Sequence, residues 1–348
     1  MRSLPEALQE GEVIASLAEG WGLEVESPRY APVGFGSYHW DVTDAAGRRY
    51  FATVDDLDHK TWLGHDRESV FAGLRGAFDA AVALREGGLQ FVVAPIPAVN
   101  GESVRRISAR HTVALFPFVD RSHGSFGEDS ATGGRADLIQ MLAELHRATR
   151  VALPVARRCS VDLADRRLLE AALRELDRTW TGGPFSEPVR ELLAGNASGL
   201  LGRLQAFDRL AAEVAAAGAG LVITHGEPHA GNVLRTADRI LLVDWDTVGL
   251  ALPERDLALV TSDAGELALY TEATGRNIDP AAMALYRLRW GLDDIAIYTS
   301  LFRSMHAYTA DTEKAWRSLS DGVQRDERWP LAAEMLTIMT VKESNAEW

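Results

Sequence analysis

The residues with the clearest chemical potential form two blocks joined by a short hairpin. The first block, His225–Asn232, reads HGEPHAGN, and the second begins at Asp244, twelve residues after Asn232. Phosphoryl transfer needs an acid that orients the acceptor hydroxyl and oxygen ligands that hold magnesium. Glu227 fits the first role. Asn232 and Asp244 fit the second, because a hairpin between them returns the chain to the same place. The spacing therefore predicts a phosphotransferase site.

A zinc site made of His225, Glu227 and His229 is the alternative for the first block. The zinc-protease pattern needs histidines four apart on a helix, and Pro228 argues against a helix at this place. We therefore expect His225 to brace the backbone of the loop rather than to bind metal or transfer protons.

The segments that precede these blocks show strand periodicity, interrupted by one helix. The predicted strands cover residues 33–42, 49–54, 91–97 and 104–119. The helix is predicted over 67–85, where apolar residues recur at helical spacing, and it ends at Gly87. The result is a small sheet carrying one helix.

Beyond residue 120 helical spacing dominates, over 136–150, 188–217 and most of 281–318. A strand pair over 233–236 and 240–243 supplies the hairpin between the two chemical blocks. A chain of 348 residues suits two domains. We expect an α+β fold with two lobes: an N-terminal lobe, 1–119, with the small sheet, and a mostly helical C-terminal lobe, 120–348.

Composition restricts the partners and the compartment. Fifty acidic residues against 36 basic ones give a net charge of −14, which disfavours nucleic-acid binding because phosphate neutralisation needs a basic surface. Cys159 is the single cysteine and cannot form an internal disulfide, which indicates a reducing compartment. Without an export signal or a long apolar run, we expect a cytoplasmic protein with no membrane segment. Its oligomeric state is open.

Together the two blocks resemble the aminoglycoside phosphotransferase family, kinase-like enzymes that phosphorylate small hydroxylated molecules. The resemblance also rests on the LAELHRAT segment at 142–149 and the LPERDL run at 252–257, and it extends from about Gly34 to Tyr298. It implies a bilobal fold of the protein-kinase type. The segment VDWDTVGLALPERDL is most similar to the spectinomycin phosphotransferase branch.

The sequence departs from the family pattern at two positions. Family members carry Asp where this chain has Glu227, so the carboxylate here has one more methylene. The strand that delivers a lysine to the nucleotide phosphates in the family has Thr53 in its place. Lys60, Arg48 and Arg49 are the alternative cations, and the sequence does not choose among them.

The resemblance also assigns a nucleotide site in the N-terminal lobe. Gly34, Gly36 and Ser37 would form the loop over the phosphates, since glycine lets backbone N–H groups approach them. The segment VALFPFV resembles the hinge between the lobes, where backbone groups around Phe116 and Phe118 would hold a purine. Without the resemblance, the glycines indicate only a turn, and VALFPFV indicates an apolar core strand.

The function expected from these observations is ATP- or GTP-dependent O-phosphorylation, with Mg²⁺, of a small hydroxylated molecule. Acidic residues outnumber basic ones 17 to 10 from Trp245 to Trp348, which favours a cationic acceptor such as an aminoglycoside or aminocyclitol. An acidic surface that only promotes solubility would show the same excess. The alternative function is that of a pseudokinase, which binds nucleotide or a small molecule without transfer.

Overall fold

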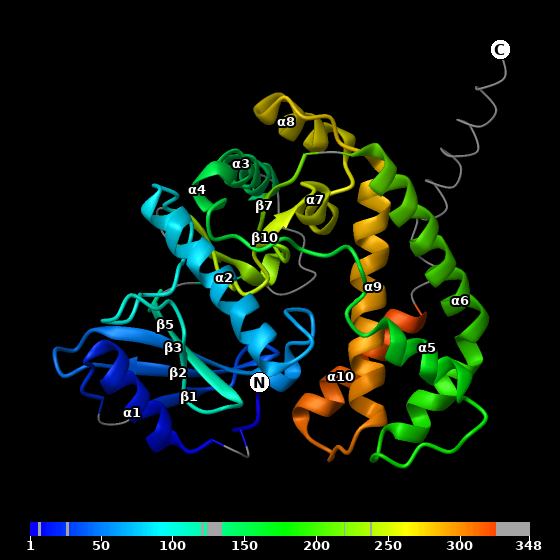
Figure 1. The fold of residues 1–348 in the computed structure, drawn as a ribbon, viewed down its shortest axis with the longest axis horizontal. Helices are drawn as coiled ribbons and strands as arrows, with labels where there is room; N and C mark the ends of the chain where they lie inside the picture. The colour runs from blue at the N-terminus through cyan, green and yellow to red at the C-terminus, as the bar shows by residue number, and fades with distance from the viewer. Residues whose placement is uncertain are drawn as a thin grey trace. The chain divides into compact units, whose positions relative to one another are not determined.

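The computed structural model describes residues 1–5, 8–25, 28–119, 122–123, 134–218, 220–236 and 239–324. The chain forms two compact units (Figure 1). The first unit joins Met1–Ser160 to Leu221–Asn277, and the second joins Val161–Gly220 to the chain from Ile278 onward. All the candidate site residues named above belong to the first unit. The lobes expected over 1–119 and 120–348 divide the chain differently and stay a prediction.

The first unit contains a five-stranded antiparallel sheet with the order β1-β2-β3-β5-β4. Its strands are β1 (Arg29–Ala31), β2 (Ser37–Thr43), β3 (Arg49–Asp56), β4 (Arg105–Arg106) and β5 (His111–Pro117). Successive residues of β3 point to opposite faces, as strand geometry requires. Ala52 and Val54 pack in one apolar core with Leu17 of α1 (Glu10–Trp21). The opposite face packs on α2 (Arg67–Glu86) through Ala114.

The remaining elements of the first unit surround the loop that carries the chemical blocks. They are η1 (Leu57–His59), β6 (Ser122–His123), α3 (Gly134–Arg147), α4 (Thr149–Ala152), β7 (Val222–Thr224), η2 (Ala230–Asn232), β8 (Val233–Arg235), β9 (Ile240–Leu242), β10 (Gly249–Ala251), α7 (Glu254–Val260) and α8 (Ala264–Thr274). β7 pairs with β10, and β8 pairs with β9 and β6, all antiparallel. The two short sheets hold both ends of the loop.

The second unit is helical. It contains α5 (Arg166–Arg174), α6 (Ser186–Ala217), α9 (Pro280–Arg303) and α10 (Ala310–Gln324), and α9 contacts each of the other three. α9 begins at Pro280 after an Asp279 carboxylate that accepts the backbone N–H of Ala281, a combination that favours a helix start. Within the described residues, no helix is long and apolar enough to cross a membrane.

The expected α+β fold, with an N-terminal sheet and a mostly helical C-terminal region, is confirmed. The strand expected over 91–97 is wrong. Val92 forms only an isolated bridge to Leu242, and Pro95 and Pro97 remove the N–H groups that a longer pairing would need.

The helical structure expected over most of 281–318 is confirmed, and it consists of α9 and α10 with an interruption between them. His306 lies in this interruption, where its N–H donates to the Gly182 carbonyl and its ring accepts the N–H of Phe185. These contacts replace the helical hydrogen bonds.

Candidate active site

The loop between β7 and η2 is fixed by hydrogen bonds to its backbone. The buried Asp256 carboxylate accepts the N–H groups of His225, at 2.9 Å, and Gly226, at 2.6 Å. The His225 ring donates from Nε2 to the Val243 carbonyl at 2.9 Å and accepts the Glu227 N–H at Nδ1. Burial lowers the pKa of His225 to about 4, so the ring stays neutral, as an accepting Nδ1 requires. His225 therefore braces the loop.

Zinc does not fit these residues. Both ring nitrogens of His225 are engaged in hydrogen bonds, and among the described residues no group of three or more His, Cys, Asp or Glu side chains could hold a metal ion. A cation at this loop therefore needs other oxygen ligands, such as a side-chain amide, phosphate and water.

Gly226 occupies a position that other residues cannot take. Its φ is 104°, and a Cβ would overlap the Arg255 guanidinium and lie 2.6 Å from Thr247 Oγ1. We expect Gly226→Ala to lower the free energy of unfolding by at least about 2 kcal/mol, because it adds both backbone strain and overlap. Urea unfolding measures this. The control is Gly11→Ala in α1, where a Cβ meets no atom within 4 Å. Equal stability of the two variants would contradict the assignment.

Asn232 and Asp244 meet across the β8–β9 hairpin. The Val243 N–H donates to the Asn232 carbonyl at 3.0 Å, which places Asp244 next to Asn232. The Asn232 side-chain amide donates to the Glu227 carbonyl at 2.9 Å, which orients its oxygen for another partner. Asp244 has a φ of 67°, the one positive value at a non-glycine residue in the described chain. Such strain is typical of functional positions.

Lys60 lies in a buried cluster of carboxylates. It follows η1 at the end of β3, and its side chain is 1% exposed. Its Nζ lies 2.5 Å from Asp246, 3.0 Å from Asp55 and 3.3 Å from Ser37 Oγ. The Ser37 hydroxyl in turn donates to Asp55 at 2.6 Å. The cluster therefore ties the end of β3 and the start of β2 to the segment that follows Asp244.

Thr53 lies two residues before Asp55 in β3, so both side chains lie on one face of the strand. The Thr53 hydroxyl lies 3.2 Å from His39 Nδ1. Lys60, through its contact with Asp55, therefore lies on the same face of β3 as Thr53.

The other cations considered for this role have different partners. Arg48 pairs with Asp44 and Arg49 with Asp41, and Arg49 also lies 3.5 Å above the Phe118 ring. Glu68, on α2, pairs with Arg106 at 2.8 Å, and its side chain is 84% exposed. The carboxylates that face Lys60 are instead those of Asp55 and Asp246.

Negative charge exceeds positive charge around Asp244. The pKa of Asp244 is raised well above its ordinary value. The surrounding protein partly desolvates its carboxylate, which keeps some exposure, and the negative charges of Asp246 and Glu227 disfavour its ionised form. Burial alone would raise the pKa of Asp246, but the Lys60 ammonium lowers it. The single Lys60 ammonium does not balance the carboxylates around it, so a net negative charge remains that a divalent cation would neutralise. Asn232 and Asp244 therefore fit a magnesium ion that takes its other ligands from phosphate and water.

The glycine-rich segment has the conformation that its glycines permit. Gly34 and Gly36 have φ values of 71° and 92°, and a Cβ at Gly36 would meet no atom within 4 Å. The segment precedes β2, in which the Ser37 hydroxyl contacts Asp55 and Lys60. Phe116 ends up beside Phe78 of α2, with ring centroids 5.6 Å apart, and Phe118 lies under Arg49. Their roles in nucleotide binding stay predictions.

Sequence reasoning missed three residues that organise this site. Asp55 and Asp246 hold Lys60, and His146 of α3 donates from Nε2 to Asp256 at 3.0 Å. All three residues are buried, and the Asp246 side chain keeps 11% of its surface exposed. A buried charge seldom lacks a partner, so Asp residues within apolar runs were the available signal.

The chain resembles known phosphotransferases in sequence and in structure. The model of the phosphotransferase enzyme family matches residues 31–293. Protein StrN of Streptomyces griseus is 30% identical over 257 residues, which cover 70% of this chain and 75% of that protein. A spectinomycin phosphotransferase, solved with ADP and spectinomycin, aligns with a TM-score of 0.69 at 16% identity, over 91% of this chain and 95% of its own. A microcompartment-associated aminopropanol kinase aligns with a TM-score of 0.60 at 17% identity, over 93% and 98%. The kinase-like fold is thereby confirmed.

Proposed function

Because the chain belongs to the phosphotransferase enzyme family and is a small-molecule kinase, we propose that it transfers the γ-phosphate of ATP or GTP, with Mg²⁺, to a hydroxyl of a small cationic molecule. The structural relatives support this class of acceptor, since one was solved with spectinomycin and another is an aminopropanol kinase. ADP in the first of them supports a nucleotide donor.

The observation that carries the proposal is the position of Lys60. Its ammonium lies 2.5 Å from Asp246, two residues beyond the proposed magnesium ligand Asp244. The missing lysine at Thr53 is the reason for the pseudokinase alternative, and the position of Lys60 beside Asp246 supports the active enzyme instead. In this proposal the Lys60 ammonium, held in place by Asp55 and Asp246, supplies positive charge beside the nucleotide phosphates.

The other roles follow from the loop geometry. Asn232 and Asp244 hold magnesium, which neutralises charge on the phosphates when it is bound. Glu227, half-buried and held at its N–H by His225, orients the acceptor hydroxyl and accepts its proton. Gly34, Gly36 and Ser37 cover the phosphates, and backbone groups around Phe116 and Phe118 hold the base.

The acceptor is proposed to be an aminoglycoside or an aminocyclitol. The excess of acidic over basic residues after Trp245, 17 to 10, raises the local concentration of cations. Such acceptors carry both amino groups and hydroxyls, so the same molecule satisfies the charge and supplies the nucleophile.

The magnesium assignment predicts a specific thermal shift. Mg·ATP at about 100 times its Kd should stabilise the wild type by about 2.7 kcal/mol, because the ligand binds only the folded state. Asp244→Ala should remove most of this shift, measured as the change in Tm on adding Mg·ATP or Mg·GTP. Asp208→Ala, which removes a carboxylate paired with Arg166 in the second unit, should keep it. Equal shifts in wild type and Asp244→Ala would exclude the metal role.

A further inference from the structure

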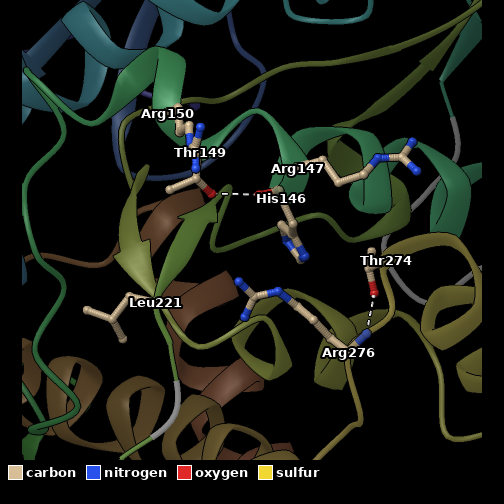
Figure 2. Close-up of a pocket in the computed structure, with 7 residues that line it drawn as sticks. All are labelled: His146, Arg147, Thr149, Arg150, Leu221, Thr274 and Arg276. Atoms are coloured by element: carbon tan, nitrogen blue, oxygen red, sulfur yellow. Dashed lines mark hydrogen bonds between the residues drawn. The ribbon is translucent and has the colours of Figure 1, made fainter.

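A pocket of about 360 Å³ lies in the first unit beside the segments that support the catalytic loop (Figure 2). It is bounded by the end of α3, the start of α4, the residue before β7 and the C-terminal end of α8. Its lining residues are His146, Arg147, Thr149, Arg150, Leu221, Thr274 and Arg276. Its volume lies within the range of small-molecule sites.

The lining of this pocket is strongly cationic. Three of its seven residues are arginines and none is acidic, although the whole chain carries a net charge of −14. Figure 2 shows the Arg276 side chain reaching toward the middle of the lining residues, whereas Arg147 extends outward. A guanidinium offers a planar set of donors that matches phosphate oxygens. The lining therefore selects an oxyanion.

Capping of helix ends accounts for only part of this charge. Arg147 does cap an end, because its Nη1 donates to the Ala273 carbonyl of α8 at 2.7 Å. The C-terminal ends of α3 and α8 each carry roughly half a negative charge. Even without Arg276, the guanidinium groups of Arg147 and Arg150 exceed that sum, so the lining keeps a net positive charge.

Two residues of the pocket wall are bonded to the support of the catalytic loop. The buried His146 ring donates to Asp256, whose carboxylate accepts the N–H groups of His225 and Gly226. The Thr149 hydroxyl accepts the N–H of Ile223 in β7, at 3.0 Å, and donates to the His146 carbonyl. The occupied pocket would thus hold α3 and β7 together at the start of the loop that carries Glu227.

We propose that this pocket binds a phosphate group, free or as a phosphate monoester, and that its occupancy steadies the catalytic loop through His146 and Asp256. The site is separate from the proposed nucleotide cluster around Lys60, and the residues that line the two share no member. Binding here needs no phosphoryl transfer, so failure of this proposal would leave the proposed function intact.

Calorimetric titration tests the binding. Inorganic phosphate and glycerol phosphate are titrated at low ionic strength into the full chain saturated with Mg·AMP-PNP. The double variant Arg150→Ala/Arg276→Ala should bind either probe about tenfold or more weakly, because two charge-assisted contacts are lost. Arg174→Ala/Arg209→Ala removes two exposed arginines from the second unit and should bind as the wild type does. Binding of phosphate but not glycerol phosphate would assign the free ion, and the reverse result would assign the monoester.

Three results would overturn the proposal: no binding to the wild type, equal affinities in the two double variants, or binding that appears only when the nucleotide is absent. Hydrogen exchange tests the proposed link between the pocket and the catalytic loop. Inorganic phosphate should slow exchange of the Gly226 amide in the wild type and not in Arg150→Ala/Arg276→Ala. Unchanged exchange at Gly226 in phosphate-saturated wild type would refute the link to the loop.

Discussion

Glu227→Gln should lower phosphoryl transfer to a cationic acceptor by roughly 10²–10⁴-fold, the range expected for a positioned acid–base group. Nucleotide affinity should stay nearly unchanged, because Lys60 supplies the proposed charge beside the phosphates and Asn232 and Asp244 make the proposed metal contacts. The backbone of Glu227 is held by His225 and Asn232. The amide side chain should therefore keep the loop geometry while losing the ability to accept the proton. Rates of transfer and the Kd for Mg·ATP are measured on the same preparation.

Glu227→Asp is the companion variant. It restores the family residue, but it shortens the side chain by one methylene. A pocket adapted to Glu should lose activity with Asp, because the acceptor hydroxyl would lie out of reach. Transfer by Glu227→Gln at the wild-type rate would remove Glu227 from the mechanism.

Lys60→Met should have two large effects, one on stability and one on nucleotide binding. The ammonium is buried against Asp55 and Asp246. Removing it leaves buried carboxylates without their cation, which costs about 3–5 kcal/mol of unfolding free energy. Nucleotide affinity should fall as well, because the positive charge proposed to lie beside the phosphates is lost. Urea unfolding and titration with Mg·ATP measure the two effects separately.

Matched variants at the β3 face separate these effects. Thr53→Ala should change nucleotide affinity little, since Lys60 already supplies the cation. Lys60→Met/Thr53→Lys places an ammonium on the family strand position and should recover part of the affinity that Lys60→Met loses. If nucleotide affinity is the same in wild type, Lys60→Met and Thr53→Ala, the cation role of Lys60 is wrong.

The sequence was most informative where the site is local in the chain. Glu227, Asn232 and Asp244 lie within 18 positions of one another, so their spacing and the intervening hairpin were enough to predict that Asn232 and Asp244 would meet. The hairpin itself was predicted at 233–236 and 240–243, and the structure has β8 and β9 there.

Contacts between distant segments could not be predicted in this way. Lys60 and Asp246 are 186 positions apart, and His146 and Asp256 are 110 apart, so no spacing rule connects them. The strand alignment indicated only that Thr53 lacked the family lysine. Lys60 was one of three cations offered in its place, and packing decides which of them reaches the carboxylates.

The segment 91–97 shows a different limit. Its apolar residues are buried as those of a strand would be, but Pro95 and Pro97 prevent continuous pairing. Apolar composition predicted burial correctly and strand pairing wrongly, because burial and hydrogen bonding are separate requirements.

The most direct measurement is mass spectrometry of acceptors incubated with the wild-type protein, magnesium and ATP or GTP. The panel contains aminocyclitols, aminoglycosides, basic peptides and choline-like amines that carry a hydroxyl. We expect one acceptor class to gain a single phosphoryl group on a hydroxyl, with an equal amount of nucleoside diphosphate formed, and no product with Asp244→Ala. If the wild type binds Mg·ATP yet phosphorylates no member of the panel, the proposed acceptor class is contradicted and the binding-only alternative is favoured.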